Sequence, residues 1–368
     1  MRFPKKMLPA MLFFALVSCG EKPKSPLSII AYYAGDATHI EAYPIEKLTH
    51  IIFSFVHLKG NELAVGSRED SLTLQKLTSL KQRNPGLKII LSLGGWGGCE
   101  TCSEVFSSDQ GRREFAASVL KTARHFGTDG IDLDWEYPVI PGFPKHRYAP
   151  EDKENFTALV KILRQTLGQS QEINFAAGGF TEYLQKSIEW DKIAPLIDKV
   201  NLMTYDLVHG NSKVTGHHTP LYSTPLGIES ADHAVKFLDS IRFPLHKLVI
   251  GAAFYARVFE AEVNVGNGLY QPGKFNFAIN YRDLKKDSLE KSGFNFLWDD
   301  IAKAPYAYNQ TAQQLITYDD KRSLALKTQY AIEHKLNGIM FWELSCDEEK
   351  NGLLDAIYDT ANGAMVND

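Results

Sequence analysis

The chain has 368 residues, of which 44% are hydrophobic and 23% are charged, and this composition is typical of a folded globular protein rather than a disordered one. The formal net charge of -4, with no Lys- or Arg-rich stripe beyond the first residues, argues against a nucleic-acid partner. We therefore expect one large α/β domain or two smaller ones, and a neutral substrate.

The N-terminal segment carries the pattern of an export signal. A basic start is followed by an apolar run from Met7 to Val17, which is too short to span a bilayer and predicts a secretory signal rather than a transmembrane anchor. "LVSC", residues 16–19, resembles the lipobox of bacterial lipoproteins, in which the cysteine carries the lipid. We therefore expect a signal peptide over residues 1–19 ending at Cys19, and a tether over residues 20–27. Gly20 favours a lipid-anchored protein of the outer membrane, at the cell surface or on the periplasmic face.

Short, almost continuously apolar runs alternate with segments of helical periodicity along the rest of the chain. Such runs are typical of parallel strands that are covered on both faces. The predicted strands are 28–33, 50–56, 88–93, 130–136, 173–177, 199–205, 247–254 and 338–344. The predicted amphipathic helices are 70–83, 109–126, 151–168, 230–242 and 322–336.

Eight strands alternating with helices predict an α/β fold of the (β/α)8 TIM-barrel type. An open doubly wound sheet is the alternative, but no Gly-rich dinucleotide fingerprint follows the first strand. About eighty residues separate the last two strands, where roughly two dozen would suffice for a crossover. We therefore expect a catalytic barrel over residues 28–258 and 317–362, with an aromatic-rich α+β insertion domain over residues 259–316 between strands 7 and 8.

Three cysteines remain after the leader. Cys99 and Cys102 lie in the loop "GGWGGCETC", and in an exported protein a local disulfide is the favoured state. Half of a zinc site is the alternative, but no second pair of ligands occurs at a suitable spacing. Cys346 is left unpaired, and we expect neither a metal nor a cofactor.

The segment "DGIDLDWEYP", residues 129–138, places several acids in a strand that is otherwise apolar. Asp132, Asp134 and Glu136 are spaced by two, so the strand points all three into the barrel, whereas Asp129 has the opposite parity. Burial and mutual repulsion raise pKa values in such a group and make it share protons, which suits a general acid. Glu136 is nearest the opening. A strand end satisfied by hydrogen bonds or cations, or a Ca²⁺ site, is the alternative.

This segment resembles the D-x-x-D-x-D-x-E signature of the family 18 glycoside hydrolases, the chitinases and their relatives. The likeness covers nearly all of residues 28–355. Four more segments are similar to motifs of that family, each at a predicted strand end. They are "KIILSLGGW" (88–96), "NLMTYDL" (201–207), "GAAFYAR" (251–257) and "GIMFWEL" (338–344).

The resemblance implies a role for each acid and for its neighbours. Glu136 protonates the leaving oxygen and later acts as base, while the N-acetyl group of the substrate is the nucleophile. Asp134 turns towards Glu136 and the acetamido group, hydrogen-bonding to both, and Asp132 holds the proton that Asp134 gives up. Tyr205 is similar to the phenol that binds the acetamido oxygen, and Asp206 to the acid that contacts the distorted sugar.

The resemblance also implies a set of substrate-binding residues around the cleavage site. Trp342 would form the apolar floor, as its flat ring suits the face of a pyranose, although an ordinary barrel filler is the alternative. Trp96 is a further stacking candidate on the loop after the third strand. The full set is Tyr32, Phe55, Gly95, Trp96, Met203, Tyr255, Arg257, Met340 and Trp342.

Two departures from the family pattern stand out. Ala253 and Ala256 occupy positions where Pro and Gly are expected. "TGHHTPLY", residues 215–222, is close to a family loop, and its adjacent His217 and His218 suggest a metal site. No third ligand is evident, so we favour loop packing or a substrate contact.

Together these features predict a monomeric chitinase that hydrolyses β-1,4-linked N-acetylglucosamine in chitin or its oligosaccharides with retention of configuration. An endo-β-N-acetylglucosaminidase acting on N-glycans is the enzymatic alternative. A non-catalytic chitin-binding lectin is the alternative of another class, although such members generally lack the acid found here at Glu136.

Overall fold

The computed structural model describes residues 27–363. The predicted leader with Cys19, and nearly all of the predicted tether, lie outside these residues and stay predictions. Within residues 27–363, no helix combines the length and the apolar character that crossing a membrane requires.

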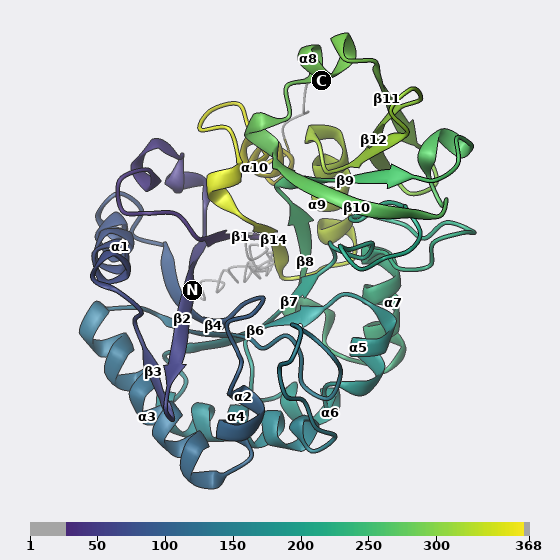
Figure 1. Cartoon of the computed structure of the whole chain (residues 1–368). Coiled ribbons are helices and arrows are strands. Elements are labelled where there is room, and N and C mark those ends of the chain that lie inside the picture. The colour runs from purple at the N-terminus through teal and green to yellow at the C-terminus, as the bar shows by residue number, and fades with distance from the viewer. Residues whose placement is uncertain (1–26, 364–368) are drawn as a thin grey trace, which may run out of the picture.

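Eight parallel strands form a closed barrel, so the predicted (β/α)8 fold is confirmed (Figure 1). Their order around the barrel is β1-β14-β8-β7-β6-β5-β4-β2, and pairing of β1 with β2 closes the ring. The strands are β1 (Ser28–Tyr33), β2 (His50–Lys59), β4 (Lys88–Gly94), β5 (Gly130–Asp134), β6 (Glu172–Gly178), β7 (Lys199–Met203), β8 (Leu248–Ala253) and β14 (Gly338–Trp342). A short strand, β3 (Glu62–Ala64), extends β2 as an antiparallel hairpin.

The predicted helices surround the barrel. They are α1 (Arg68–Ser79), α3 (Asp109–Phe126), α4 (Asp152–Leu167), α7 (Ala231–Ser240) and α9 (Lys321–Glu333). In α3 the Ser108 side chain accepts a hydrogen bond from the Gly111 N–H, and Gly127 ends the helix at a φ of 73°. The prediction missed α2 (Cys102–Phe106), α5 (Thr181–Lys186), α6 (Trp190–Ile193), α8 (Lys286–Lys291) and α10 (Leu353–Ala361). Most of these helices are too short to show a helical period in the sequence.

Side chains alternate between two cores because successive residues of a strand face opposite sides. Outward-facing residues such as Ile131 and Leu133 pack in a large cluster between strands and helices. Inward-facing residues fill the barrel itself with Ile30, Tyr32, Ile52, Ile90, Ala176, Met203, Tyr205, Val249, Ala253 and Met340. At the base of the barrel, the Glu172 carboxylate accepts a hydrogen bond from Lys199 at 2.7 Å and forms an ion pair with Lys88. The barrel is therefore a filled core rather than a channel.

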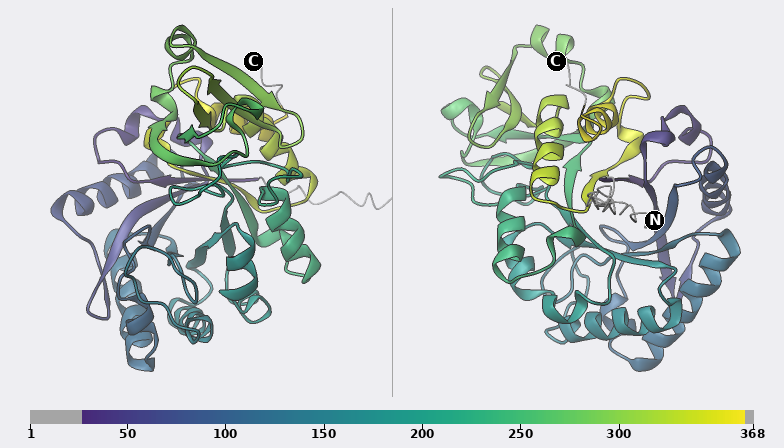
Figure 2. Two further views of the ribbon diagram at one scale, coloured as in Figure 1. Left: turned by 45° about the vertical axis from the view of Figure 1, so that its right-hand side comes forward. Right: turned by 180° about the vertical axis from the view of Figure 1, so that it is seen from behind.

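A five-stranded antiparallel sheet occupies the chain between β8 and β14 (Figure 2). Its order is β10-β9-β13-β12-β11, with β9 (Tyr255–Ala261), β10 (Gly273–Asn280), β11 (Phe294–Asp299), β12 (Ala304–Asn309) and β13 (Gln314–Thr317). The predicted seventh barrel strand agrees with β8 to one residue at each end, but β9 begins at Tyr255, before the predicted barrel boundary at residue 258. Tyr255 and Arg257 therefore belong to the five-stranded sheet.

A buried ion pair ties this sheet to the barrel. Lys327 of α9 donates hydrogen bonds to Asp319 Oδ2 and to Thr219 Oγ1, both at 2.6 Å. Asp319, which follows β13, also accepts the Ala253 N–H at the end of β8 at 3.0 Å. Both charged side chains are 0% exposed. Removing one partner of such a pair leaves an uncompensated charge in the interior.

We expect Lys327→Met to lower the free energy of unfolding by about 3–5 kcal/mol, because Asp319 then lacks its cation. Urea unfolding followed by tryptophan fluorescence measures this loss. Lys274→Met is the control, as it removes the exposed pair between Lys274 and Glu260 and should have no measurable effect. Equal losses in the two variants would contradict the assignment of the buried pair as a structural clamp.

Candidate active site

The three inward acids of "DGIDLDWEYP" lie at the C-terminal end of β5. Asp132 and Asp134 are buried within the strand, opposite Ser92 and Gly94 of β4. Glu136 follows the last residue of β5 and is partly exposed. Asp129, with the opposite parity, binds the Ile89 N–H at 2.7 Å and Lys81 at 2.6 Å outside the barrel. Because successive side chains of a strand point to opposite faces, Asp132 and Asp134 face the barrel interior and Asp129 faces outwards.

Asp132 is the deepest acid, and three donors satisfy it. Its carboxylate accepts hydrogen bonds from Ser92 Oγ at 2.7 Å, Asn201 Nδ2 at 3.0 Å and the Tyr32 hydroxyl at 3.1 Å. Burial raises the pKa of Asp132 to about 6, and the three donors oppose that rise. Tyr32 is 1% exposed, so it supports Asp132 and does not offer an open ring face.

Asp134 is surrounded very differently. Its Oδ1 is buried and has no hydrogen-bond partner within residues 27–363, and no hydrogen bond joins its side chain to Asp132 or Glu136 in the same range. Burial, followed by the charges of Glu136 and Asp132, raises the pKa of Asp134 well above its usual value. Burial and the two neighbouring charges therefore favour the protonated form of Asp134, and its Oδ1 is available for a new partner.

Glu136 is the acid that a ligand can reach. Burial, and to a smaller extent the charge of Asp206, raise the pKa of Glu136 to about 7, while a hydrogen bond with Tyr137 opposes the rise. A carboxyl that titrates near neutral pH can both give and accept a proton under the same conditions.

Asp206 provides a negative charge after the end of β7. Its backbone lies in the left-handed region, with a φ of 56°. Arg257 contacts both carboxylate oxygens, and the Tyr255 hydroxyl donates to Oδ1 at 2.7 Å. Burial works against ionisation, but His218 and Arg257 together hold the pKa of Asp206 well below its usual range. The site thus combines acids of raised pKa in and after β5 with an acid of lowered pKa after β7.

Aromatic side chains form the apolar part of the site. The Trp342 ring is partly exposed and stacks on Phe55 with centroids 5.5 Å apart and planes 15° apart. Met340 is buried, and its sulfur lies 3.9 Å from the Tyr205 hydroxyl. Met203 is buried in the same barrel-interior cluster. Trp342 therefore presents a supported flat surface at the strand ends.

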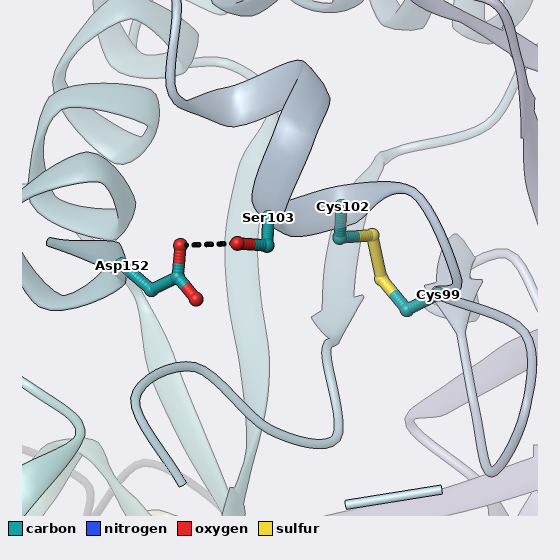
Figure 3. The surroundings of a disulfide bond; sticks show 4 residues. All are labelled: Cys99, Cys102, Ser103 and Asp152. Carbon is teal, nitrogen blue, oxygen red and sulfur yellow. Dashed lines mark hydrogen bonds between the residues drawn. A yellow bond between two sulfur atoms is a disulfide. The ribbon is translucent and has the colours of Figure 1, made fainter. Parts of the chain in front are cut away.

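A tight loop after β4 lies against this surface. Gly95 has a φ of 77°, and a Cβ there would lie 2.4 Å from the Phe55 ring. Trp96 is 55% exposed, and its ring meets the edge of Phe143 with centroids 5.7 Å apart. The structure joins Cys99 and Cys102, farther along the loop, by a disulfide (Figure 3).

The disulfide leads directly into a second attachment of this loop. Ser103 donates a hydrogen bond to Asp152, the first residue of α4, at 2.9 Å (Figure 3). Cys346, the remaining cysteine of the described range, is buried and unpaired. The loop that carries Trp96 is thus held near its start by the packing of Gly95 against Phe55, and after the disulfide by the hydrogen bond from Ser103 to α4.

Two important residues escaped the prediction. Ser92 and Asn201 supply donors to Asp132 from the neighbouring strands β4 and β7. Each is a polar side chain in an apolar strand, at a position whose parity faces inward, and this signal could have identified them.

His217 and His218 do not share a metal site. His217 Nε2 lies 3.0 Å from Asp299 of the five-stranded sheet, whereas His218 Nδ1 lies 3.4 Å from Asp206 Oδ1. Within residues 27–363, no three His, Cys, Asp or Glu side chains gather in a way that could hold a metal ion.

A filled parallel barrel with titrating carboxyls and an aromatic floor at its C-terminal strand ends is the architecture of a carbohydrate-cleaving enzyme. The chain belongs to the glycosyl hydrolases family 18, whose model matches residues 28–347.

Individual relatives show how far this likeness extends. Chitinase A1 of Niallia circulans is 36% identical over 306 residues, which are 75% of this chain but 43% of that protein, so this chain spans less than half of its length. Chitotriosidase-1 of Mus musculus is 31% identical over 322 residues, covering 82% of this chain and 68% of the relative. The solved structure of a family 18 N-acetylglucosaminidase from Paenibacillus barengoltzii superposes with a TM-score of 0.82 at 34% identity, over 91% of this chain and 99% of that one.

We expect Gly95→Ala to push the Phe55 ring off Trp342, because the added methyl group has no room. A crystal structure of the variant measures the displacement, and the near-UV circular dichroism spectrum reports the altered aromatic packing. Gly60→Ala is the matched control, since Gly60 also has a positive φ but nothing lies within 4 Å of the added atom. It should lose about 1–2 kcal/mol of stability from backbone strain alone, with no change in that spectrum. An unmoved Phe55 in Gly95→Ala would refute the packing argument.

Proposed function

We propose that this protein is a chitinase that hydrolyses β-1,4 linkages between N-acetylglucosamine units with retention of configuration. The observation that carries the proposal is the set of Asp132, Asp134 and Glu136, with a reachable carboxyl of pKa about 7 at its outer end. The names of two relatives, a chitinase and a chitotriosidase, support the choice of substrate.

Glu136 is the proton donor in this proposal. It gives its proton to the glycosidic oxygen as the bond to the anomeric carbon breaks, and it later removes a proton from the attacking water. Asp134, whose Oδ1 lacks a partner, turns towards Glu136 and the acetamido N–H of the bound sugar. These new contacts favour the ionised form of Asp134, and the Asp132 carboxylate takes up the proton that Asp134 releases.

The attacking atom in this proposal is the carbonyl oxygen of the substrate's own N-acetyl group. A retaining mechanism with a protein nucleophile needs a second free carboxylate beside the sugar. The raised pKa of Asp134 disfavours its ionised form, and both oxygens of Asp206 are engaged by Arg257. Both observations agree with the substrate-assisted mechanism that the family resemblance implies. The acetamido oxygen attacks instead, and Tyr205 hydrogen-bonds to it as the positive oxazolinium forms.

Apolar stacking and polar contacts then fix the sugar at the cleavage site. Trp342, supported by Phe55, offers its ring to the C–H face of the pyranose. The Asp206 carboxylate, held by Tyr255 and Arg257, contacts the distorted sugar from another side of the site. Trp96 is exposed on its anchored loop and stacks on a sugar farther along the chain.

The products formed from defined N-acetylglucosamine oligomers test the proposal. We expect cleavage with initial release of the β-anomer, and no release of glycan from a high-mannose glycoprotein. The reverse pattern would identify an endo-β-N-acetylglucosaminidase. Release of single sugars only would indicate an N-acetylglucosaminidase, the activity named for the Paenibacillus barengoltzii structure.

We expect Glu136→Gln to reduce kcat by about a thousandfold or more, because the proton donor is lost while the shape of the site is kept. Calorimetry should show that the variant still binds the oligomers. Glu104→Gln, an exposed change of the same chemistry, should leave both quantities unaltered. If Glu136→Gln turned over as fast as the parent enzyme, the catalytic assignment would fail, and binding without turnover in the parent would identify a lectin.

The raised pKa of Glu136 sets a pH dependence. The acid must be protonated to donate, so kcat/KM should be high below about pH 7 and fall as the pH rises through the pKa. Asp206→Asn removes a negative charge that raises this pKa, so the residual activity should fall at lower pH than in the parent enzyme. Asp109→Asn, which removes an exposed acid of α3, should leave the profile in place. A common profile for all three proteins would contradict the coupling between Asp206 and Glu136.

A further inference from the structure

His218 is a buried side chain to which the proposed mechanism gives no role. It is 0% exposed, and its ring packs against Tyr255 with centroids 5.3 Å apart. Nδ1 lies 3.4 Å from Asp206 Oδ1, without the alignment of a hydrogen bond, and Nε2 has no hydrogen-bond partner within the described residues. A buried imidazole with so few polar contacts is costly unless it serves a charged neighbour.

The backbone of His218 is fixed on both sides. Its N–H donates to Thr317 Oγ1 at 3.1 Å, at the end of β13. Its carbonyl accepts the Leu207 N–H at 3.0 Å, and Leu207 directly follows Asp206. His218 therefore contacts the Asp206 carboxylate with its side chain and holds the backbone next to Asp206 with its carbonyl group. Asp206 is held in a left-handed conformation that a non-glycine residue adopts only when its surroundings impose it.

The polar surroundings of His218 favour a neutral ring. Burial lowers the pKa of His218, although Asp206 opposes this effect. The charged and titratable groups that face it are Asp206 after β7, Tyr255 and Arg257 of β9, and Asp319 after β13. Arg257 already neutralises Asp206, and Lys327 neutralises Asp319. A neutral imidazole whose Nδ1 faces Asp206 is therefore the consistent state.

We propose that His218 is a positioning residue, which helps to orient the Asp206 carboxylate towards the cleavage site. Arg257 and Tyr255 approach Asp206 from β9, and His218 approaches it from the loop after β7 and packs against Tyr255. Together the three groups restrict the orientation of the carboxylate. The inference rests on the proposed function, because it concerns how well the same site acts on the same substrate.

The neighbouring His217 is a matched control. It is adjacent in sequence and also buried, but it binds Asp299 at 3.0 Å and lies against Tyr306 of the five-stranded sheet. Within residues 27–363 its ion pair is with Asp299 and not with Asp206. A loss of loop packing would affect both histidines, whereas a loss of carboxylate orientation would affect only His218.

The test compares His218→Leu, His218→Asn and His217→Leu with the parent enzyme on N-acetylglucosamine oligomers. We expect His218→Leu to lower kcat/KM by about tenfold to a hundredfold, because Asp206 shifts from its position. The fall of activity at high pH should also move to lower pH, towards the profile of Asp206→Asn, since less negative charge then faces Glu136. His218→Asn, whose amide can occupy the place of Nδ1, should restore both quantities, and His217→Leu should alter neither.

A double variant separates positioning from general packing. In an Asp206→Asn background, adding His218→Leu should change neither the pH profile nor kcat/KM further, because the group that His218 orients is already lost. His218→Gln, which keeps an amide but moves it away from the Nδ1 position, replaces His218→Leu if that variant does not fold. An unshifted profile in His218→Leu, or additive effects with Asp206→Asn, would overturn the inference. An inactive parent enzyme would instead refute the proposed chitinase function.

Discussion

The Asp134 carboxyl lies inside a closed barrel where no cation balances it and no donor satisfies its Oδ1 within the described residues. An isolated carboxylate is costly in such surroundings, so burial raises the pKa of Asp134. Asp132, one step deeper, meets three donors and can carry charge more easily. The acid next below Glu136 along the strand is therefore the one whose ionised form is least supported. The chemistry proposed for the site depends on that placement.

The five-stranded sheet contributes charge as well as shape. Tyr255 and Arg257 come from β9, and together they hold Asp206 as an ion at the end of β7. That negative charge raises the pKa of Glu136 from across the site. A barrel without the sheet would lack the Tyr255 and Arg257 side chains that bind Asp206. The five-stranded sheet therefore influences the pKa of Glu136 through Asp206, and this influence depends on how the sheet is attached to the barrel.

That attachment depends on a few buried polar contacts rather than on a broad apolar surface alone. Asp319 accepts the Ala253 N–H and pairs with Lys327 of α9, so one carboxylate joins the end of β8, the end of β13 and an outer helix. The backbone of His218 bridges the loop after β7 to Thr317. These contacts fix the position of the five-stranded sheet relative to the barrel, and this position brings Arg257 to Asp206.

Much of the fold and part of the site follow from local patterns. The apolar runs located all eight barrel strands, and the spacing of apolar residues located α3 over residues 109–126. The period of two along β5 was enough to place Asp132, Asp134 and Glu136 on the inward face. Local patterns failed where the chain turns quickly, as at the boundary between β8 and β9 and in the short helices α5 and α6. There too few residues lie in one element for a period to develop.

The sequence alone determined which residues could carry charge into the barrel, because strand geometry orders side chains by parity. Only the tertiary structure decided how far the pKa of each acid is raised or lowered. Ser92 and Asn201 lie 40 and 69 residues from Asp132 in the chain, and Arg257 lies 51 residues from Asp206. Such distant residues supply the hydrogen-bond donors and cations that surround a buried carboxyl. These groups, together with burial, determine its pKa.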